Sequence, residues 1–521
     1  MKKFPIGIQN FSRIRNEGFL YIDKTMIIHK MITQGVAYFL SRPRRFGKSL
    51  LVSTLEALFL GKRELFSGLW IDSCDYNWTE YPVIRLDISK TVSSSSEALS
   101  TSLQEMIKVN AEKYEIKGIE RAFPSLSLSA LVTELSKKGP VVILIDEYDK
   151  PLVHHLEDMT VVAKNRDILR DFYTMIKALD EYLHFVFVTG VSKFSKVSLF
   201  SGMNNLLDIS LNPNYSALLG LTDKEIRRDL HEEMLNVAHL RDKDEETNFK
   251  EMKQWYNGYL FAQSNALERV YNPLSVFQFL KNAKLDNYWF TTATPTFAIE
   301  LIKKQKYSIP DLEQGTIAGK EIETDHEVNI IDLTTLLFQT GYLTIDSYDE
   351  NSWTYRLKFP NEEVKRSFLE QLLFEFAEMR PSEMHTILFK LIKNLKNKDL
   401  NGFFEIFNYL FSSIPYQINL KQEAYYHSLI YLVLKTLGFS MQSEISTHDG
   451  RIDMVIKTDL YLFIFEFKID SDSKNALNQI LEKKYYNQYK LESKEIILVG
   501  ANFDTKTRLL KDWCSESIKI N

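Results

Sequence analysis

The residues best suited to chemistry form an eight-residue stretch near the N-terminus, Arg42-Pro-Arg-Arg-Phe-Gly-Lys-Ser49. It resembles the phosphate-binding loop G-x-x-x-x-G-K-[S/T] except at the first position, where Arg42 stands in place of glycine; Gly47 occupies the second glycine position. Backbone N–H groups in such loops point at phosphate oxygens. We therefore expect Lys48 to reach the β- and γ-phosphates and the Ser49 hydroxyl to ligate Mg²⁺.

Two further arginines, Arg44 and Arg45, lie inside this loop. A guanidinium group binds phosphate oxygens in a fixed fork geometry. The two side chains are expected to contact phosphate within their own chain or to act as arginine fingers for an adjoining subunit. The structural alternative is that they attach the loop to the domain surface.

Acidic residues follow a run of five apolar residues, 141–145, at Asp146 and Glu147. The C-terminal ends of strands are where parallel α/β sheets bind ligands. Asp146 is expected to hold Mg²⁺ through water and Glu147 to polarise the attacking water. A later strand ends near Thr189 and Ser192, either of which suits a sensor of the γ-phosphate; a plain turn there is the alternative.

A second cluster lies near the C-terminus, in Gly450-Arg-Ile-Asp453 and Phe465-Glu466-Phe-Lys468. Residues two apart on a strand face the same way, so Glu466 and Lys468 are expected to point into one site. Asp453 would meet them across a hairpin. Two carboxylates suit Mg²⁺ or Mn²⁺, which activates water for phosphodiester cleavage, while Lys468 orients water or neutralises charge. A fold that binds without cutting is the alternative.

The first of these sites requires strands that end at a common edge. Short apolar or β-branched runs alternate with helical segments, which is typical of a parallel sheet covered by helices. Strands are predicted at 37–41, 83–88, 141–145, 185–189 and 206–211.

The middle of the chain is mainly helical in pattern. Its last part reads as helix 331–339, strands 342–347 and 354–359, and helix 362–374, an order consistent with a small winged-helix unit. A helical connector over 383–411 follows. The C-terminal region predicts helix 422–437, strands 442–446, 451–457 and 460–468, helix 474–490 and strand 495–500.

Four segments of the N-terminal half resemble the bacterial AAA-ATPase-like family, which is similar to ATPases of the STAND type. They are Tyr21-Ile-Asp-Lys-Thr25, the loop from Arg42 to Leu50, Leu144-Ile-Asp-Glu-Tyr-Asp149, and Thr189-Gly-Val-Ser-Lys-Phe194. The resemblance covers residues 4–220 and extends more loosely beyond. An arginine-rich loop without its first glycine is usual in that family, so the resemblance implies that Arg42 does not abolish binding.

The C-terminal cluster resembles the PD-(D/E)XK nuclease superfamily, although Ile452 stands where the proline of that name would be. The resemblance implies that Glu423, on the preceding helix, lies near the metal. It also implies that Gln479 and Tyr485, on the following helix, position the scissile phosphate.

Together these patterns predict an α/β protein of four parts. They are a P-loop AAA-like ATPase domain (1–220), a helical lid with a winged-helix-like region (221–375), a helical connector (376–418) and a PD-(D/E)XK nuclease-like domain (419–521).

Composition limits the partners and the compartment. A net charge of −5 over 521 residues gives no whole-chain attraction to nucleic acid, so any DNA or RNA contact would be local. Two distant cysteines exclude a disulfide framework. The N-terminus has no apolar signal region and no run reaches the length of a membrane span. A cytoplasmic protein is expected, with an oligomer left open.

The leading hypothesis is an ATP-binding and ATP-hydrolysing protein that regulates a Mg²⁺-dependent nuclease-like domain acting on nucleic acid. The second is a nucleotide-switched signalling or defence protein whose C-terminal domain binds but does not cleave. A purely structural ATP-binding module is the third.

Overall fold

The computed structural model describes residues 2–193, 199, 205–264, 267–289, 298–299, 301–302, 309–322, 332–413, 423–440, 442–448, 451–489, 494–504, 506–507 and 509–518. For residues 310, 311, 314, 423–427, 439–440, 442–448, 451–453, 485 and 488 only the backbone is described. The chain divides into two compact units, Met1–Ala298 with Gly315–Val364, and Ile299–Gln314 with Lys365–Asn521.

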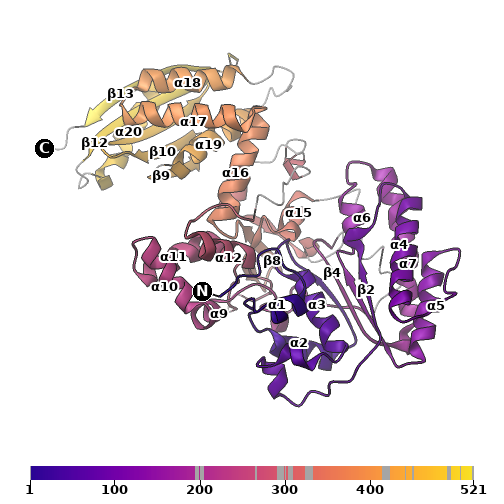
Figure 1. The fold of residues 1–521 in the computed structure, drawn as a ribbon. Helices are drawn as coiled ribbons and strands as arrows, with labels where there is room; N and C mark the ends of the chain where they lie inside the picture. Colours follow the sequence, from indigo (N-terminus) through magenta and orange to yellow (C-terminus); the bar gives the residue numbers. More distant parts are fainter. Residues whose placement is uncertain are drawn as a thin grey trace. The chain divides into compact units, whose positions relative to one another are not determined.

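A five-stranded sheet of order β2-β3-β4-β1-β5 forms the centre of the first unit, and every neighbouring pair is parallel (Figure 1). The strands are β1 (Ala37–Ser41), β2 (Val83–Asp87), β3 (Val141–Asp146), β4 (Leu183–Gly190) and β5 (Leu207–Asp208). The predicted α/β parallel sheet is thus confirmed. Every residue of β3 is buried, which explains its unbroken apolar run.

Helices cover this sheet. α3 packs against β2, β3 and β4, whereas α4 packs against β2 and α5 against β3, with α7 lying against both helices. The helices before the lid are α1 (Phe11–Asn16), α2 (Thr25–Gln34), α3 (Lys48–Phe59), α4 (Ser96–Lys113), α5 (Pro124–Ser136), α6 (Lys150–Val153) and α7 (Met159–Ala178).

The helical region over 221–289, where a lid was predicted and which is called the lid below, has its own apolar core. It is built by Ile226, Leu230, Val237, Met252 and Phe279 together with Ile22 from the N-terminal segment. Its helices are α9 (Asp223–Asp229), α10 (His231–Leu240), α11 (Glu245–Tyr256) and α12 (Pro273–Asn282). A capping box starts α9.

The predicted helix and hairpin after the lid are present as α15 (Leu333–Thr340), β7 (Thr344–Asp349) and β8 (Thr354–Lys358). The structure adds β6 (Thr316–Ala318), giving an antiparallel sheet of order β6-β8-β7. α16 (Glu362–Ala377) begins in this unit and continues into the second.

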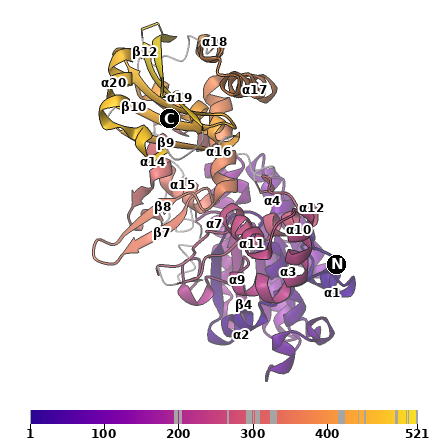
Figure 2. The same cartoon turned by 90° about the vertical axis from the view of Figure 1, so that its left-hand side faces the viewer.

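The second unit contains a mixed sheet of order β13-β12-β11-β10-β9, in which only β11 and β12 are parallel (Figure 2). Its strands are β9 (Gln442–His448), β10 (Arg451–Lys457), β11 (Tyr461–Ile469), β12 (Glu495–Asp504) and β13 (Leu509–Ile518). Its other helices are α14 (Ile309–Gln314), α17 (Pro381–Lys396), α18 (Leu400–Ser412), α19 (Glu423–Ser440) and α20 (Ser473–Lys483).

Two helices, α17 and α18, make up the span where a helical connector over 383–411 was expected. Asp399 is the N-cap that starts α18, since its side chain accepts from the N–H of Gly402. The aromatic face of α18 packs on the sheet, with Phe403 against Phe465 and Phe407 against Phe467. None of the helices in the described part of the chain combines the length and the apolar character that crossing a membrane needs.

Candidate functional site

The phosphate loop connects β1 to α3 and turns at Gly47, whose φ of 96° lies in the left-handed region that glycine adopts at little cost. Lys48 follows as the first residue of α3 and is only 4% exposed. Its Nζ donates to the carbonyls of Arg42 at 3.0 Å and Pro43 at 3.2 Å. The loop therefore holds its lysine inward, against its own backbone.

The carboxylate of Asp146 ends β3 beside Ser49. Burial raises the pKa of Asp146, a hydrogen bond with Ser49 opposes that shift, and Glu147 adds to it. Within the described part of the chain, the buried Oδ1 of Asp146 has no hydrogen-bond partner. A buried carboxylate oxygen beside a hydroxyl suits a divalent cation that prefers oxygen ligands, so these residues fit Mg²⁺.

Two residues at the site have backbone conformations that residues other than glycine rarely adopt. Glu147 has a φ of 56° and Arg45 a φ of 68°. Such conformations cost free energy and gather at functional sites, where the surrounding structure enforces them. Here the conformation at Glu147 turns its partly exposed side chain out of the line of β3 and into the cavity.

A cavity of about 470 Å³ brings most of the predicted residues together. Arg44, Arg45, Lys48, Ser49 and Glu147 all line it. It is also lined by polar residues that the sequence analysis missed, Asp87, Ser89, Lys150 and His154.

The missed residues follow the ends of neighbouring strands. Asp87 ends β2 directly opposite Asp146, so the rule that placed Asp146 at the sheet edge could have placed Asp87 there as well. Lys150 donates to the carbonyl of Ser89 and joins the two strand ends. Partial burial, then Lys150 and Arg44, lowers the pKa of His154.

Thr189 and Ser192 do not line this cavity. The Thr189 hydroxyl donates to the carbonyl of Leu40 at 2.7 Å, which ties β4 to β1. The Ser192 hydroxyl donates to Asp149 at 2.6 Å, and that carboxylate also accepts from the Ser192 N–H. Both hydroxyls are therefore engaged in holding the strand ends.

The described residues predicted for a C-terminal site lie on β10, β11 and α20. The register of the two antiparallel strands places Asp453 opposite Glu466. Glu466 is fully buried, and the Nζ of Lys468 donates to the side-chain oxygen of Gln479 at 2.6 Å. Lys468 and Gln479, which the sequence analysis placed on different elements of one site, are thus in direct contact.

The side chains of three residues predicted for this site lie outside what the structure describes. The backbones of Glu423 and Tyr485 lie in α19 and in the 3-10 helix Tyr485–Tyr489, and that of Asp453 in β10, but their side chains are not described. Among the described side chains, no three His, Cys, Asp or Glu residues form a group that could hold a metal ion. Glu423 and Asp453 are not among these described side chains.

Comparison with known proteins identifies both regions. Residues 5–200 match the family model described as a predicted AAA-ATPase, and residues 421–513 match that of the PD-(D/E)XK nuclease superfamily. The chain is also 36% identical over 530 residues, spanning 99% of both sequences, to an "Uncharacterized protein in vnfD 5'region" from Azotobacter chroococcum mcd 1. The chain belongs to the AAA-ATPase-like family. Its C-terminal part is a PD-(D/E)XK nuclease-superfamily domain.

In this AAA-ATPase-like chain, Arg42 has a structural task. It is 1% exposed, and its guanidinium donates to the carbonyls of Ser210 at 2.5 Å and Tyr215 at 3.2 Å. The guanidinium carbon lies 4.1 Å from the centre of the Phe261 ring, a cation–π contact. Burial lowers the pKa of Arg42 to about 9. Arg42 therefore anchors the loop to the segment that follows β5 and to Phe261, and it does not line the cavity.

Other lid residues hold the AAA-ATPase-like loop from the same side. The indole Nε1 of Trp289 donates to the carbonyl of Arg44 at 3.0 Å. Gly341 approaches Pro43 so closely that an added Cβ would lie 2.5 Å from the proline ring. Loop and lid thus form one packed structure, and nothing in the local sequence of either segment indicates this.

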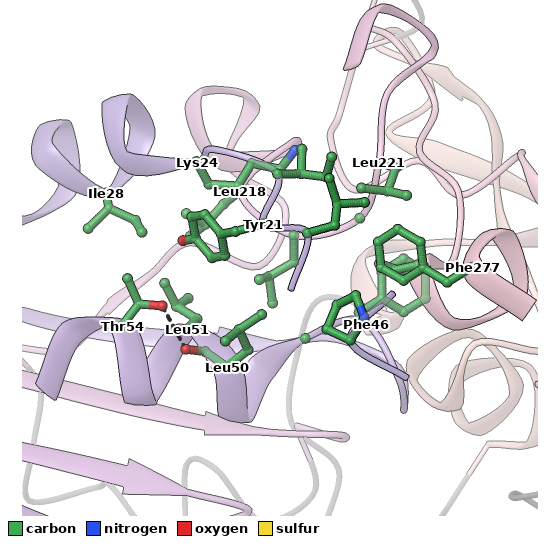
Figure 3. Close-up of a pocket in the computed structure, with 17 residues that line it drawn as sticks. Tyr21, Lys24, Ile28, Phe46, Leu50, Leu51, Thr54, Leu218, Leu221 and Phe277 are labelled. Carbon is green, nitrogen blue, oxygen red and sulfur yellow. Dashed lines mark hydrogen bonds between the residues drawn. The ribbon is translucent and has the colours of Figure 1, made fainter. Parts of the chain in front are cut away.

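A second, mostly apolar pocket of about 90 Å³ adjoins the cavity that Lys48 and Glu147 line (Figure 3). The two share Pro5, Gly47, Leu50, Pro273 and Phe277 in their walls. The polar side chains that line the apolar pocket are Tyr21, Lys24 and Thr54. Lys24 Nζ donates to the carbonyl of Ala217 and to both carboxylate oxygens of Glu225.

Proposed function

We propose that the chain is an ATP-binding and ATP-hydrolysing protein whose nucleotide state regulates a metal-dependent nuclease domain at its C-terminus. The observation that carries the ATPase half is the meeting of Lys48, Ser49 and Glu147 around one cavity, with Asp146 beside Ser49. These are the groups that phosphoryl transfer from a nucleotide requires.

Each residue has a role that follows from its position. Lys48, released from the carbonyls of Arg42 and Pro43, would donate to the terminal phosphates. Ser49 and Asp146 would hold Mg²⁺, which neutralises charge on the phosphate oxygens when bound. Arg44 and Arg45 line the same cavity. Their position supports phosphate contact within the chain and not a role as arginine fingers for an adjoining subunit.

Glu147 is the group placed to orient the attacking water. It lines the cavity one residue beyond Asp146, and its strained backbone sets its direction. Electrostatic stabilisation and positioning account for most of the catalysis of phosphoryl transfer, so a fixed carboxylate is more useful than a mobile one.

The adjoining apolar pocket supports adenine as the base. Tyr21 shares a hydrogen bond with Thr54, Thr54 donates to the carbonyl of Leu50 at 2.9 Å, and Lys24 is fully engaged by protein acceptors. A pocket whose polar side chains are already paired gives guanine no partners for its additional polar groups. Burial of unpaired polar groups costs free energy, so ATP should bind more tightly than GTP.

Equilibrium binding tests the nucleotide half. Wild-type protein should bind Mg²⁺·ATP more tightly than Mg²⁺·GTP, and Lys48→Ala should lose both. Tripolyphosphate, which lacks a base, should bind more weakly than ATP and be lost in the same variant. Equal ATP affinity of the Lys48→Ala and wild-type proteins would exclude the site.

The nuclease half of the proposal is supported by the pairing of Asp453 with Glu466 and by the contact of Lys468 with Gln479. A carboxylate pair would hold Mg²⁺ or Mn²⁺, which activates water when bound. Lys468, oriented by Gln479, would neutralise charge on the scissile phosphate of DNA or RNA.

One observation favours the second candidate, a nucleotide-switched protein whose C-terminal domain binds without cleaving. Glu466 is fully buried, and a carboxylate without access to substrate contributes to packing and not to turnover. Cleavage of single-stranded, duplex and branched DNA and of RNA with Mg²⁺ or Mn²⁺ separates the two. Loss of cleavage in Glu466→Gln supports catalysis, whereas binding without cleavage by wild-type protein supports the second candidate.

A further inference from the structure

The cavity that Lys48 and Glu147 line has a second basic wall, formed by Lys150 and His154. Lys150 begins the short helix α6, and His154 follows the last residue of that helix. Side chains four residues apart on a helix lie on the same face, so both can point into the same space. All the residues that line the cavity belong to the first unit, so this wall and the phosphate loop share one compact part of the chain.

The backbone that carries Lys150 is fixed to the end of β4. Asp149, only 1% exposed, accepts from the Ser192 N–H at 2.8 Å and from the Ser192 hydroxyl at 2.6 Å. The buried Tyr148 donates its hydroxyl to the Ser192 carbonyl at 2.9 Å. The N–H of Lys150 donates to the carbonyl of Glu147 at 3.1 Å. A buried network therefore holds the backbone of Lys150 beside that of Glu147.

The ammonium group of Lys150 has an uncharged acceptor. It donates to the main-chain carbonyl of Ser89, and among the described residues no carboxylate forms an ion pair with it. Asp87 fixes the turn at Ser89, because its Oδ1 accepts from the Ser89 hydroxyl at 2.6 Å and from the Ser89 N–H at 3.2 Å. Lys48 is likewise held by two main-chain carbonyls. Two ammonium groups that line this cavity thus donate to uncharged oxygens.

His154 adds little charge to the wall. Partial burial, then Lys150, Arg44 and His155, lowers the pKa of His154, and Glu147 opposes that shift. Since the ordinary pKa of histidine is about 6.5, the imidazole is mainly uncharged near pH 7. Lys150 is therefore the cation that this wall presents to the cavity.

A bound triphosphate would offer both ammonium groups a stronger acceptor. An ammonium group gains more from an anionic phosphate oxygen than from a carbonyl, because opposite charges attract strongly where the protein reduces screening by water. Lys48 would reach the β- and γ-phosphates from the loop. Lys150 lies beside Glu147, the residue placed to orient water at the γ-phosphorus. Lys150 should therefore meet the γ-phosphate only.

We propose that Lys150 recognises the γ-phosphate and leaves the Ser89 carbonyl to do so when the triphosphate enters. The inference rests on the proposed function and assigns to Lys150 the sensor role that was predicted for Thr189 or Ser192. During hydrolysis water bonds to the γ-phosphorus, the bond from that phosphorus to the bridging oxygen breaks with its electron pair on ADP, and Glu147 accepts the proton of the water. Lys150 stays protonated and offsets the negative charge on the γ-phosphate oxygens.

Equilibrium binding to the full chain tests the assignment through the ratio of two affinities. Wild-type protein should bind a slowly hydrolysed Mg²⁺·ATP analogue more tightly than Mg²⁺·ADP. Lys150→Met keeps most of the side-chain length without the charge, so it should lower the affinity for the analogue by roughly tenfold or more and leave that for ADP unchanged. Lys48→Met should weaken both. Lys164→Met, at an exposed lysine of α7 that does not line the cavity, should keep both affinities.

The outcomes separate this assignment from the proposed function. Failure of wild-type protein to bind either nucleotide would remove both together. Normal wild-type binding with an unchanged ratio in Lys150→Met, or equal losses for the analogue and ADP, would remove the role of Lys150 alone. If Lys150→Met does not fold, Lys150→Gln provides the comparison, because its amide can still donate to the Ser89 carbonyl but carries no charge. Failure of both variants to fold would show that Lys150 supports the structure and would also overturn the assignment.

Discussion

The guanidinium carbon of Arg42 lies 4.1 Å from the centre of the Phe261 ring, although the two residues are far apart in the sequence. The contact forms where the phosphate-loop motif calls for glycine. At its first position, the loop of this chain therefore has a residue that fixes it to the lid, where the motif has a flexible glycine. This difference predicts that restoring the consensus glycine will harm the protein.

Arg42→Gly should lower the free energy of unfolding by about 3 kcal/mol, since a buried cation–π contact and the charge-assisted hydrogen bonds to the carbonyls of Ser41, Ser210 and Tyr215 are lost. Affinity for ATP should fall as well, because the loop loses its anchor. Thermal unfolding with and without Mg²⁺·ATP measures both effects. Arg121→Ala, at an exposed arginine outside the loop and the cavity, is the control and should leave unfolding nearly unchanged. A stabilised, tighter-binding Arg42→Gly protein would contradict the anchoring role.

The sequence alone was enough to predict those parts of the site whose positions depend on neighbouring residues in the chain. β1 and β3 could be recognised because they are apolar on both faces, and Lys48, Ser49 and Asp146 follow directly from the strand ends. Arg42 was different. Its partners Ser210 and Tyr215 lie 168 and 173 residues away, so its inward direction depends on long-range packing that no local pattern encodes.

The same reason explains the remaining differences. The direction of the Thr189 hydroxyl depends on the pairing of β4 with β1, which the positions of the strands along the chain do not determine. β6 has only three residues, and β13 mixes apolar with charged residues without regular alternation, so neither gave a strand signal.

Glu147→Gln should bind Mg²⁺·ATP as tightly as wild-type protein but release phosphate at least roughly 100-fold more slowly, since a general base contributes about that much. Gln keeps the size of the side chain and removes its charge. Single-turnover hydrolysis together with equilibrium binding separates the two effects. Glu134→Gln, at an exposed acid on α5, should behave as wild type. Unchanged turnover in Glu147→Gln would assign the role to another group.

Thr189→Val should affect stability more than turnover, since its hydroxyl donates to Leu40 and does not line the cavity. The loss of one buried hydrogen bond should cost about 1 kcal/mol in the free energy of unfolding. Denaturant unfolding and phosphate release measure the two quantities on the same preparation. A variant with normal stability and strongly reduced hydrolysis would restore Thr189 as a γ-phosphate sensor.

Glu363 should make the first unit less stable as the pH rises. Burial raises the pKa of Glu363 from 4.5 to about 7, so the folded state favours the protonated acid. The stability that this group contributes is complete below pH 4.5 and is lost as the pH rises towards 7. This difference in pKa corresponds to a loss of roughly 3 kcal/mol in the free energy of unfolding.

Glu363→Gln removes that titration and tests the argument directly. Between pH 5 and pH 8, the unfolding midpoint of wild-type protein should fall more than that of the variant. Glu350→Gln, at an exposed acid after β7, should follow wild type. Parallel pH profiles for Glu363→Gln and wild type would show that the carboxylate is ionised without cost in the folded protein.

Gln479 should act on cleavage through Lys468. Its side-chain oxygen accepts from the Lys468 ammonium at 2.6 Å. Gln479 therefore fixes the direction of Lys468, the cation that is predicted to be catalytic at this site. Gln479→Ala should lower the rate of metal-dependent cleavage by roughly tenfold and Lys468→Ala by more, because orientation is lost in the first and the charge itself in the second. Asn478→Ala, at the exposed neighbour on α20, is the control.

In a Lys468→Ala background, Gln479→Ala should have no further effect, since a positioning residue has nothing left to position. An additive loss in the double variant would mean that Gln479 contacts the substrate directly.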